Sequence, residues 1–276
     1  MKFWQVDAFT NEVFTGNPAA VFIFDHEPQY ELMMKIAREM NLSETAFVIM
    51  GVKMKIRWFT PSAEVNLCGH ATLAAAHILW QENLASGKKL IFQSKSGPLT
   101  VTKAKEGYTL DFPLQPSIEK PEYKNQITDI LNITPEYVGS NGEDCVAVVK
   151  DDATVYAFSP NFNKISALAE RGFLLTAQDS SGQYDYIYRG FFPKLNVPED
   201  PVTGSANTCL APYWAKRLNK TKLSARQVSE RSGSLVVEIS GQRVLITGPS
   251  VTVFEGKMAI ESGTYGVVDS TKEKNS

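Results

Sequence analysis

The stretch that decides the fold is CGHATLAAAHILW, residues 68–80. From position 71 to position 80 it is apolar on nearly every face of a helix, which predicts a buried helix rather than a surface one. Trp58-Phe59-Thr60-Pro61 comes shortly before it, on a segment with the composition of a strand. Gly69 stands where the chain enters the apolar run, so the sequence predicts a strand, a turn and a central helix in this order.

The same pattern returns in the second part of the chain. Gly190-Phe191-Phe192-Pro193 is followed by Val202-Thr203-Gly204-Ser205-Ala206-Asn207 and a second apolar run. Gly204 lies 135 positions after Gly69, and the similar stretches 96–101 and 232–237 are offset by 136 positions. The second copy carries a short insertion around 196–199. A nearly constant offset indicates a repeat, and it predicts two similar halves, 1–115 and 116–276, joined near 113–121. The last strand and the tail are free to pack back onto the first half.

Each half is predicted to consist of strands around one buried helix, which gives an α+β fold with a curved, mostly antiparallel, barrel-like sheet. The pattern predicts strands at 56–59, 90–92, 99–101, 108–112, 184–192, 235–239, 244–247 and 251–254. The helix of the second half is expected over 205–218, with Pro212 as a kink. Apolar spacing between Leu32 and Met40 predicts an outer amphipathic helix. The polar tail, 269–276, is expected to be loose.

Composition limits the class of protein. The chain has 276 residues, 43% of them hydrophobic and 21% charged, with a formal net charge of −2. These values are typical of a globular protein and do not favour a nucleic acid or a membrane surface as a partner. Asp7 interrupts any apolar signal region, and the longest apolar stretch is too short to span a bilayer. Three widely spaced cysteines argue against a disulfide framework, so we expect a cytoplasmic protein.

Two glycines precede the two buried helices, as Gly69-His70 and Gly204-Ser205. The first N–H groups of a helix lack intrahelical partners, and this end carries the positive pole of the helix dipole, so it favours anions. If the two halves face each other, both helix ends point into the seam between them. Such a pair suits a carboxylate substrate, and an enolate-like anion even more. The alternative is that each glycine only makes a turn.

Three further side chains could take part in proton transfer. Glu44 lies in the segment NLSETAFV, where burial among apolar neighbours would raise its pKa into a useful range; the alternative is an exposed strand residue. Asp200, in Pro198-Glu199-Asp200-Pro201, would orient His70 across the seam or act on the substrate, or else is a solvated loop acid. His70 itself could bind an anion or shuttle a proton.

Cys68 offers a second type of base, because a thiol at a helix N-terminus ionises more easily. Its counterpart in the second copy is Thr203, so the chain lacks the second thiol of a two-thiol racemase. Cys145 and Cys209 look like core residues. No spacing of cysteines and histidines fits a zinc site, and no phosphate-binding loop is present. We therefore expect neither a metal nor a cofactor.

Several motifs resemble those of the PhzF-like isomerases of phenazine biosynthesis, and the likeness runs from residue 3 to about residue 256. The motifs are Val6-Asp7-Ala8-Phe9-Thr10, Gly16-Asn17-Pro18-Ala19-Ala20-Val21, Asn41-Leu42-Ser43-Glu44-Thr45-Ala46-Phe47, Phe59-Thr60-Pro61, Cys68-Gly69-His70-Ala71-Thr72 and Glu199-Asp200-Pro201-Val202-Thr203-Gly204-Ser205-Ala206. The resemblance implies the diaminopimelate epimerase fold, with the active site between two α+β halves. It also implies Glu44 as general acid and base, His70, Asp200 and Ser205 lining the site, and Ser43, Gly69 and Gly204 holding the substrate carboxylate.

Three functions are compatible with these residues. The leading hypothesis is a cofactor-independent isomerase that moves a proton on a small carboxylate, with Glu44 as the shuttle. The second is an amino-acid racemase or epimerase that uses Cys68, which lies where that fold has its first thiol base. The third is a binding or regulatory protein on an enzyme fold. A homodimer is expected from the resemblance, because no sequence feature by itself demands one.

Overall fold

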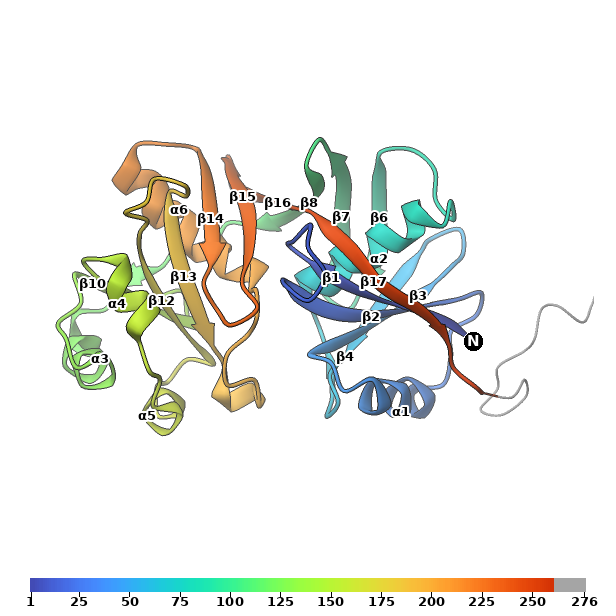
Figure 1. Cartoon of the computed structure of the whole chain (residues 1–276), viewed down its shortest axis with the longest axis horizontal. Helices are drawn as coiled ribbons and strands as arrows, with labels where there is room; N and C mark the ends of the chain where they lie inside the picture. Colours follow the sequence, from blue (N-terminus) through green and yellow to red (C-terminus); the bar gives the residue numbers. More distant parts are fainter. Residues whose placement is uncertain (261–276) are drawn as a thin grey trace, which may run out of the picture.

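The computed structural model describes residues 1–260, and the predicted loose tail lies outside the described residues. Two similar halves stand side by side, and one sheet runs through both (Figure 1). The strands of the N-terminal half are β1 (Lys2–Ala8), β2 (Asn17–Phe24), β3 (Glu44–Ile49), β4 (Lys55–Phe59), β5 (Glu64–Val65), β6 (Lys89–Ser94), β7 (Gly97–Ala104) and β8 (Gly107–Pro113). The following strands are β9 (Ile118–Glu119), β10 (Tyr137–Ser140), β11 (Asp144–Val148), β12 (Gly172–Gln178), β13 (Tyr186–Phe191), β14 (Lys222–Gln227), β15 (Gly233–Ser240), β16 (Arg243–Gly248) and β17 (Ser250–Lys257).

The strand order is the same in both halves, which explains the pattern in the sequence. The N-terminal half runs β17-β1-β2-β3-β4-β6-β7-β8, and the C-terminal half runs β9-β10-β11-β12-β13-β14-β15-β16. Corresponding pairs are parallel, β2 with β3 and β11 with β12, then β4 with β6 and β13 with β14. The remaining pairs are antiparallel. β8 pairs with β16, so the two sheets join along one ladder while β17 and β9 remain at the open edges.

A central helix lies inside each curved sheet. In α2 (Gly69–Gln81), ten of the thirteen residues are buried, which confirms the helix expected from the apolar run. The second helix differs at its start, because a 3-10 turn, η3 (Gly204–Ala206), precedes α6 (Asn207–Leu218). Pro212 lies inside α6 and lacks the N–H that would bond to the carbonyl of Thr208. That carbonyl instead accepts from the N–H of Gln115, at 3.1 Å, in the segment that joins the halves.

The outer helices differ between the halves. The N-terminal half has α1 (Tyr30–Met40), as the apolar spacing predicts, and the C-terminal half has α3 (Lys124–Leu131), α4 (Asp152–Ala157) and α5 (Phe162–Ser166). Two further 3-10 turns are η1 (Pro121–Tyr123) and η2 (Pro193–Leu195). The sequence analysis gave no element between 113 and 183, so β9 to β12 and α3 to α5 are additions from the structure. It also omitted β1, β2, β3, β5 and β14 as elements, although it expected Glu44 at the start of a strand.

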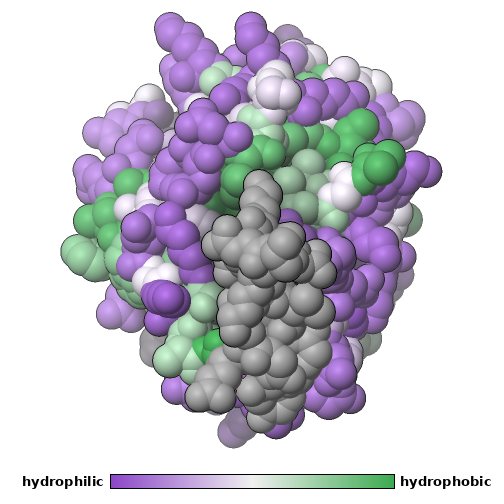
Figure 2. All heavy atoms as spheres, turned by 90° about the vertical axis from the view of Figure 1, so that its right-hand side faces the viewer, coloured by the Kyte–Doolittle hydropathy of each residue, from purple (hydrophilic) through white to green (hydrophobic). Residues whose placement is uncertain are grey.

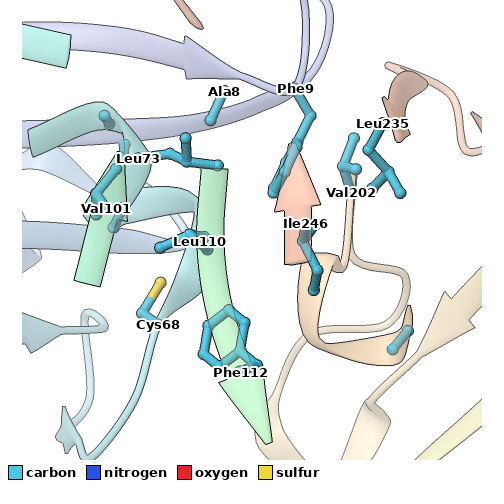
Figure 3. Close-up of a cluster of buried hydrophobic side chains, with 14 of the residues drawn as sticks. Ala8, Phe9, Cys68, Leu73, Val101, Leu110, Phe112, Val202, Leu235 and Ile246 are labelled. Atoms are coloured by element: carbon cyan, nitrogen blue, oxygen red, sulfur yellow. The ribbon is translucent and has the colours of Figure 1, made fainter. Parts of the chain in front are cut away.

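The seam between the halves has an apolar core around Phe9 (Figure 3). Phe9 is fully buried and adopts a left-handed backbone conformation with φ 64°. A Cβ on Gly204 would come within 2.8 Å of the Phe9 ring, and one on Gly248 within 2.5 Å. Both glycines therefore make room for a side chain from the other part of the seam. The last strand, β17, pairs antiparallel with β1, so the chain does return to the first half.

The outer surface is mixed in character. Figure 2 shows the end of the molecule formed by the N-terminal half, where hydrophilic side chains dominate and smaller hydrophobic areas lie between them. Within residues 1–260, the helices are all too short or too polar to cross a bilayer.

Candidate active site

A cavity of about 630 Å³ opens at the seam, and side chains from both halves line it. All eight residues that the sequence analysis selected are among its lining residues: Ser43, Glu44, Cys68, Gly69, His70, Asp200, Gly204 and Ser205. The structure thus brings together residues that are up to 162 positions apart in the chain. Their chemical roles remain predictions.

The starts of both central helices border this cavity. Gly69 is the first residue of α2, and Gly204 is the first residue of η3, which leads directly into α6. Neither start has a side chain that caps it, so its free N–H groups remain available to an anion. The two glycines differ in packing: a Cβ on Gly204 would clash with Phe9, whereas one on Gly69 would make ordinary contacts at 3.5 Å. Packing alone therefore explains why position 204 is a glycine, but it does not explain the glycine at position 69.

Glu44 is the first residue of β3, and its side chain is 18% exposed. One carboxyl oxygen, Oε2, lies 3.3 Å from Nε2 of His70. Burial and, to a smaller extent, the nearby negative charge of Asp200 raise the pKa of Glu44 to about 8, although a hydrogen bond with Ser43 opposes the shift. A carboxyl group with a pKa of about 8 can both accept and return a proton near neutral pH.

His70 is neutral at neutral pH. Its side chain is 8% exposed, and burial lowers its pKa to about 3, against the opposing effect of the Pro18 carbonyl. Nδ1 lies 3.6 Å from Sγ of Cys68, whereas Nε2 faces Glu44 and has no well-aligned hydrogen bond of its own. The contact between His70 and Glu44 is therefore one between two polar groups rather than an ion pair, and Nε2 is a buried atom.

Asp200 does not orient His70, which corrects one of the two roles expected for it. Its Oδ1 accepts a hydrogen bond from Nδ2 of Asn17 at 2.9 Å, and its Oδ2 accepts one from the hydroxyl of Thr203. Neither ring nitrogen of His70 bonds to it. Burial raises the pKa of Asp200, and the two donors oppose this shift. Of the two functional roles expected for Asp200, action on the substrate is the one that stays a prediction.

Cys68 is a poor base in this structure. It is buried beside Leu110 and Phe112 (Figure 3), and burial raises the pKa of its thiol well above the ordinary value. The negative charge of Glu44 acts in the same direction, and the N–H groups of Ala71 and His70 only partly oppose it. The expected effect of a helix N-terminus on a thiol is thus outweighed by burial.

Glu44, Cys68 and His70 together form a group that could also hold a metal ion. A carboxylate oxygen of Glu44, the sulfur of Cys68 and a ring nitrogen of His70 all lie within 4.8 Å of one another. These are the ligand types that zinc uses in proteins. The sequence analysis found no such group because Glu44 is far from the other two in the chain.

The opposite wall of the cavity contains charged residues that the sequence analysis did not select. Nη2 of Arg171 lies 2.8 Å from Glu143, and its Nε lies 3.2 Å from Asp144. Behind the predicted site, the buried Asn17 bonds to Asp200 and accepts from the hydroxyl of Ser43. The only signal for Asn17 was its place in the quoted Gly-Asn-Pro motif, which did not suggest a role.

Comparisons with known proteins identify the family of this chain. A family model described as phenazine biosynthesis-like protein matches residues 6–256. An uncharacterized isomerase from Halalkalibacterium halodurans is 43% identical over 259 residues, which cover 93% of this chain and 98% of that protein. The crystal structure of a phenazine biosynthesis protein of the PhzF family from Enterococcus faecalis has a TM-score of 0.90 and 42% identity, and the match covers 94% of this chain and 99% of that one.

A more distant likeness supports the fold class alone. A probable proline racemase from Agrobacterium radiobacter is 12% identical, with a TM-score of 0.60 over 94% of this chain and 93% of that one. The fold is therefore the two-halved α+β architecture that the repeat and the resemblance predict. The chain belongs to the phenazine biosynthesis-like protein family, and it is an isomerase of that family.

Proposed function

We propose that this isomerase moves a proton from one carbon to another on a small carboxylate substrate, with Glu44 as general acid and base and without a cofactor. The observation that carries the proposal is the position of Glu44: a carboxyl group with a pKa of about 8 lies in a cavity bordered by two uncapped helix starts. A second acid of the cavity, Asp200, is held by hydrogen bonds from the protein.

The reaction can be followed proton by proton. The N–H groups at Gly69 and Gly204, together with Ser43, hold the substrate carboxylate, and Ser205 lines the site. Ionised Glu44 accepts a proton from a carbon next to an unsaturated or carbonyl-like group, and the electron pair moves into the substrate. The helix starts stabilise the resulting enolate-like anion. Protonated Glu44 exchanges its carboxyl proton with water and then returns a proton to a different carbon, so the enzyme ends in its initial state.

Exchange with heavy water tests this function. The protein is incubated in D2O with a panel of small carboxylates, and carbon-bound deuterium is measured by NMR and mass spectrometry. We expect deuterium at the carbon that receives the proton, together with a shifted double bond. Binding of a carboxylate with no exchange and no product would instead favour the third hypothesis, a binding or regulatory protein.

The pH dependence should report the ionisation of Glu44. A base must be ionised to accept a proton, so kcat/KM should rise with pH through a midpoint near 8, as burial and Asp200 both raise this pKa. In Asp200→Asn, one of these two causes is removed, and the midpoint should move to lower pH whatever the absolute rate. The control is Glu143→Gln, because Glu143 pairs with Arg171 on the opposite wall. An unchanged midpoint in Asp200→Asn would contradict the assignment.

The racemase alternative rests on Cys68, and two measurements separate it from the proposal. Because burial holds the thiol in its neutral form, Cys68→Ala should keep most of the turnover, and iodoacetamide at mildly alkaline pH should not inactivate the enzyme. Thr203, the counterpart of Cys68, donates its hydroxyl to Asp200 and titrates far too high to act as a base unaided. An inactive but folded Cys68→Ala variant would favour the racemase.

Two further expectations belong to this proposal. The composition favours a cytoplasmic location, and the family resemblance favours a homodimer. Sedimentation at several protein concentrations would measure the oligomeric state directly. A monomer at all concentrations would contradict the second expectation without affecting the assignment of Glu44.

A further inference from the structure

Asn17 is fully buried at the start of β2, and it makes three hydrogen bonds to two other segments of the chain. Its Nδ2 donates to Oδ1 of Asp200 and to the carbonyl of Val202, each at 2.9 Å. Its Oδ1 accepts a hydrogen bond from the hydroxyl of Ser43 at 3.1 Å. One amide side chain thus connects the segment before Glu44 to the loop that carries Asp200 in the other half.

Other contacts also hold the backbone around Asn17. Pro18 follows, so the residue before it is restricted to extended conformations. From the second half, the carbonyl of Ser232 accepts from the N–H of Gly16 at 2.7 Å, and Nε of Arg231 donates to the carbonyl of Gly16 at 2.9 Å. The amide of Asn17 therefore extends into the seam from a backbone that these contacts hold in place.

The chemistry of this position requires an amide. A carboxylate at position 17 could still accept from Ser43, but it would lose both donors and would face the carboxylate of Asp200. An alanine would lose every bond and would leave the two partner segments without a link. On the far side, the amide of Gln227 already holds the Asp200 loop through the carbonyl of Asp200 and the N–H of Thr203. Asn17 supplies the corresponding link to the first half.

We propose that Asn17 is a positioning residue, which fixes the spacing across the seam between the Glu44 carboxyl and the Asp200 carboxyl. This inference rests on the proposed function, because it assigns no contact with substrate to Asn17. Ser43 directly precedes Glu44, so a shift at Ser43 moves the general base relative to the substrate. A misplacement of about 1 Å can lower a rate about 100-fold.

The test uses Asn17→Ala and Asn17→Asp, with Thr109→Val as a matched control. Thr109 also bonds across the two halves, because its hydroxyl lies 2.8 Å from that of Thr247 where β8 pairs with β16, but it neither lines the cavity nor holds the backbone at Asn17. With the carboxylate that exchanges in D2O, both Asn17 variants should lose about 100-fold in kcat while KM changes little. Thr109→Val should lose some thermal stability and keep its kcat when assayed well below its melting temperature.

Crystal structures give a measurement that needs no substrate. The separation between the Cα atoms of Glu44 and Asp200 should increase by about 1 Å in Asn17→Ala and should not change in Thr109→Val. If Asn17→Ala does not fold, Asn17→Ser replaces it, since its hydroxyl can keep only one of the three bonds. Wild-type spacing and wild-type kcat in a folded Asn17 variant would overturn the inference. Full exchange activity in Glu44→Gln would overturn the proposed function instead, so the two failures are distinguishable.

Discussion

Replacing Glu44 with glutamine should abolish turnover while the protein still folds and still binds a carboxylate. Glutamine has nearly the same shape, and it can occupy the space beside His70 and Ser43, but it cannot accept a proton from carbon. Removal of a general base typically lowers a rate by ~10²–10⁴. This corresponds to about 3–5 kcal/mol in the barrier, at roughly 1.4 kcal/mol for each factor of ten.

The measurement is the rate of deuterium incorporation for wild type and variant on the same substrate. Glu143→Gln is the matched control, because Glu143 lines the same cavity but pairs with Arg171 on the other wall. It should retain most of the turnover. Binding of the substrate to Glu44→Gln, measured by calorimetry, should remain within a few-fold, because the helix starts rather than Glu44 hold the carboxylate.

Two results would change the mechanism. Full turnover in Glu44→Gln would remove Glu44 from the reaction. If Glu44→Gln and Cys68→Ala are both inactive while both are folded, the site uses two bases. The chemistry would then be an epimerisation at one carbon, with one base on each face, and the proton would not move between carbons.

The meeting of the candidate residues at one cavity could be predicted from the sequence, because similar stretches recur at a nearly constant offset. Each glycine before an apolar run marks one helix start, and the offset of 135 positions places the two starts at equivalent points of two similar halves. Once the halves face each other, Gly69 and Gly204 meet at one cavity. The prediction of the fold class has the same origin, since the two strand orders correspond.

Other features could not be predicted, because they depend on tertiary contacts. The segment Asp144–Val148 is a short apolar run, and periodicity alone does not distinguish a buried strand from a helix there. The ionisation of Cys68 was expected to be easier at a helix start, yet burial reverses the direction of the shift. Asn17 acquires its partners 183 and 185 positions away, and no local pattern indicates such a link.

Trp214→Ala should be among the most destabilising single substitutions in the C-terminal half. Trp214 is fully buried on α6, where its ring stacks on Tyr186 at 5.6 Å and its Nε1 donates to the hydroxyl of Thr176 at 3.0 Å. The substitution leaves a large cavity, and such changes cost about 3–5 kcal/mol of unfolding free energy. Urea unfolding followed by circular dichroism measures the difference. Trp214→Phe is the control, because it keeps most of the ring and loses mainly the hydrogen bond, which is worth about 1 kcal/mol.

The effect of Trp214→Ala on catalysis should be much smaller than its effect on stability. Trp214 lies in the second half of α6, whereas the proposed anion-binding groups lie before its first residue, in η3. That end has hydrogen bonds of its own, because Asn207 donates to the carbonyl of Gly204 and to the hydroxyl of Tyr188, each at 3.1 Å. While the variant is folded, its kcat should therefore stay close to that of wild type. A large loss of kcat in folded protein would show that the position of the whole helix, and not its first turn alone, sets the geometry of the site.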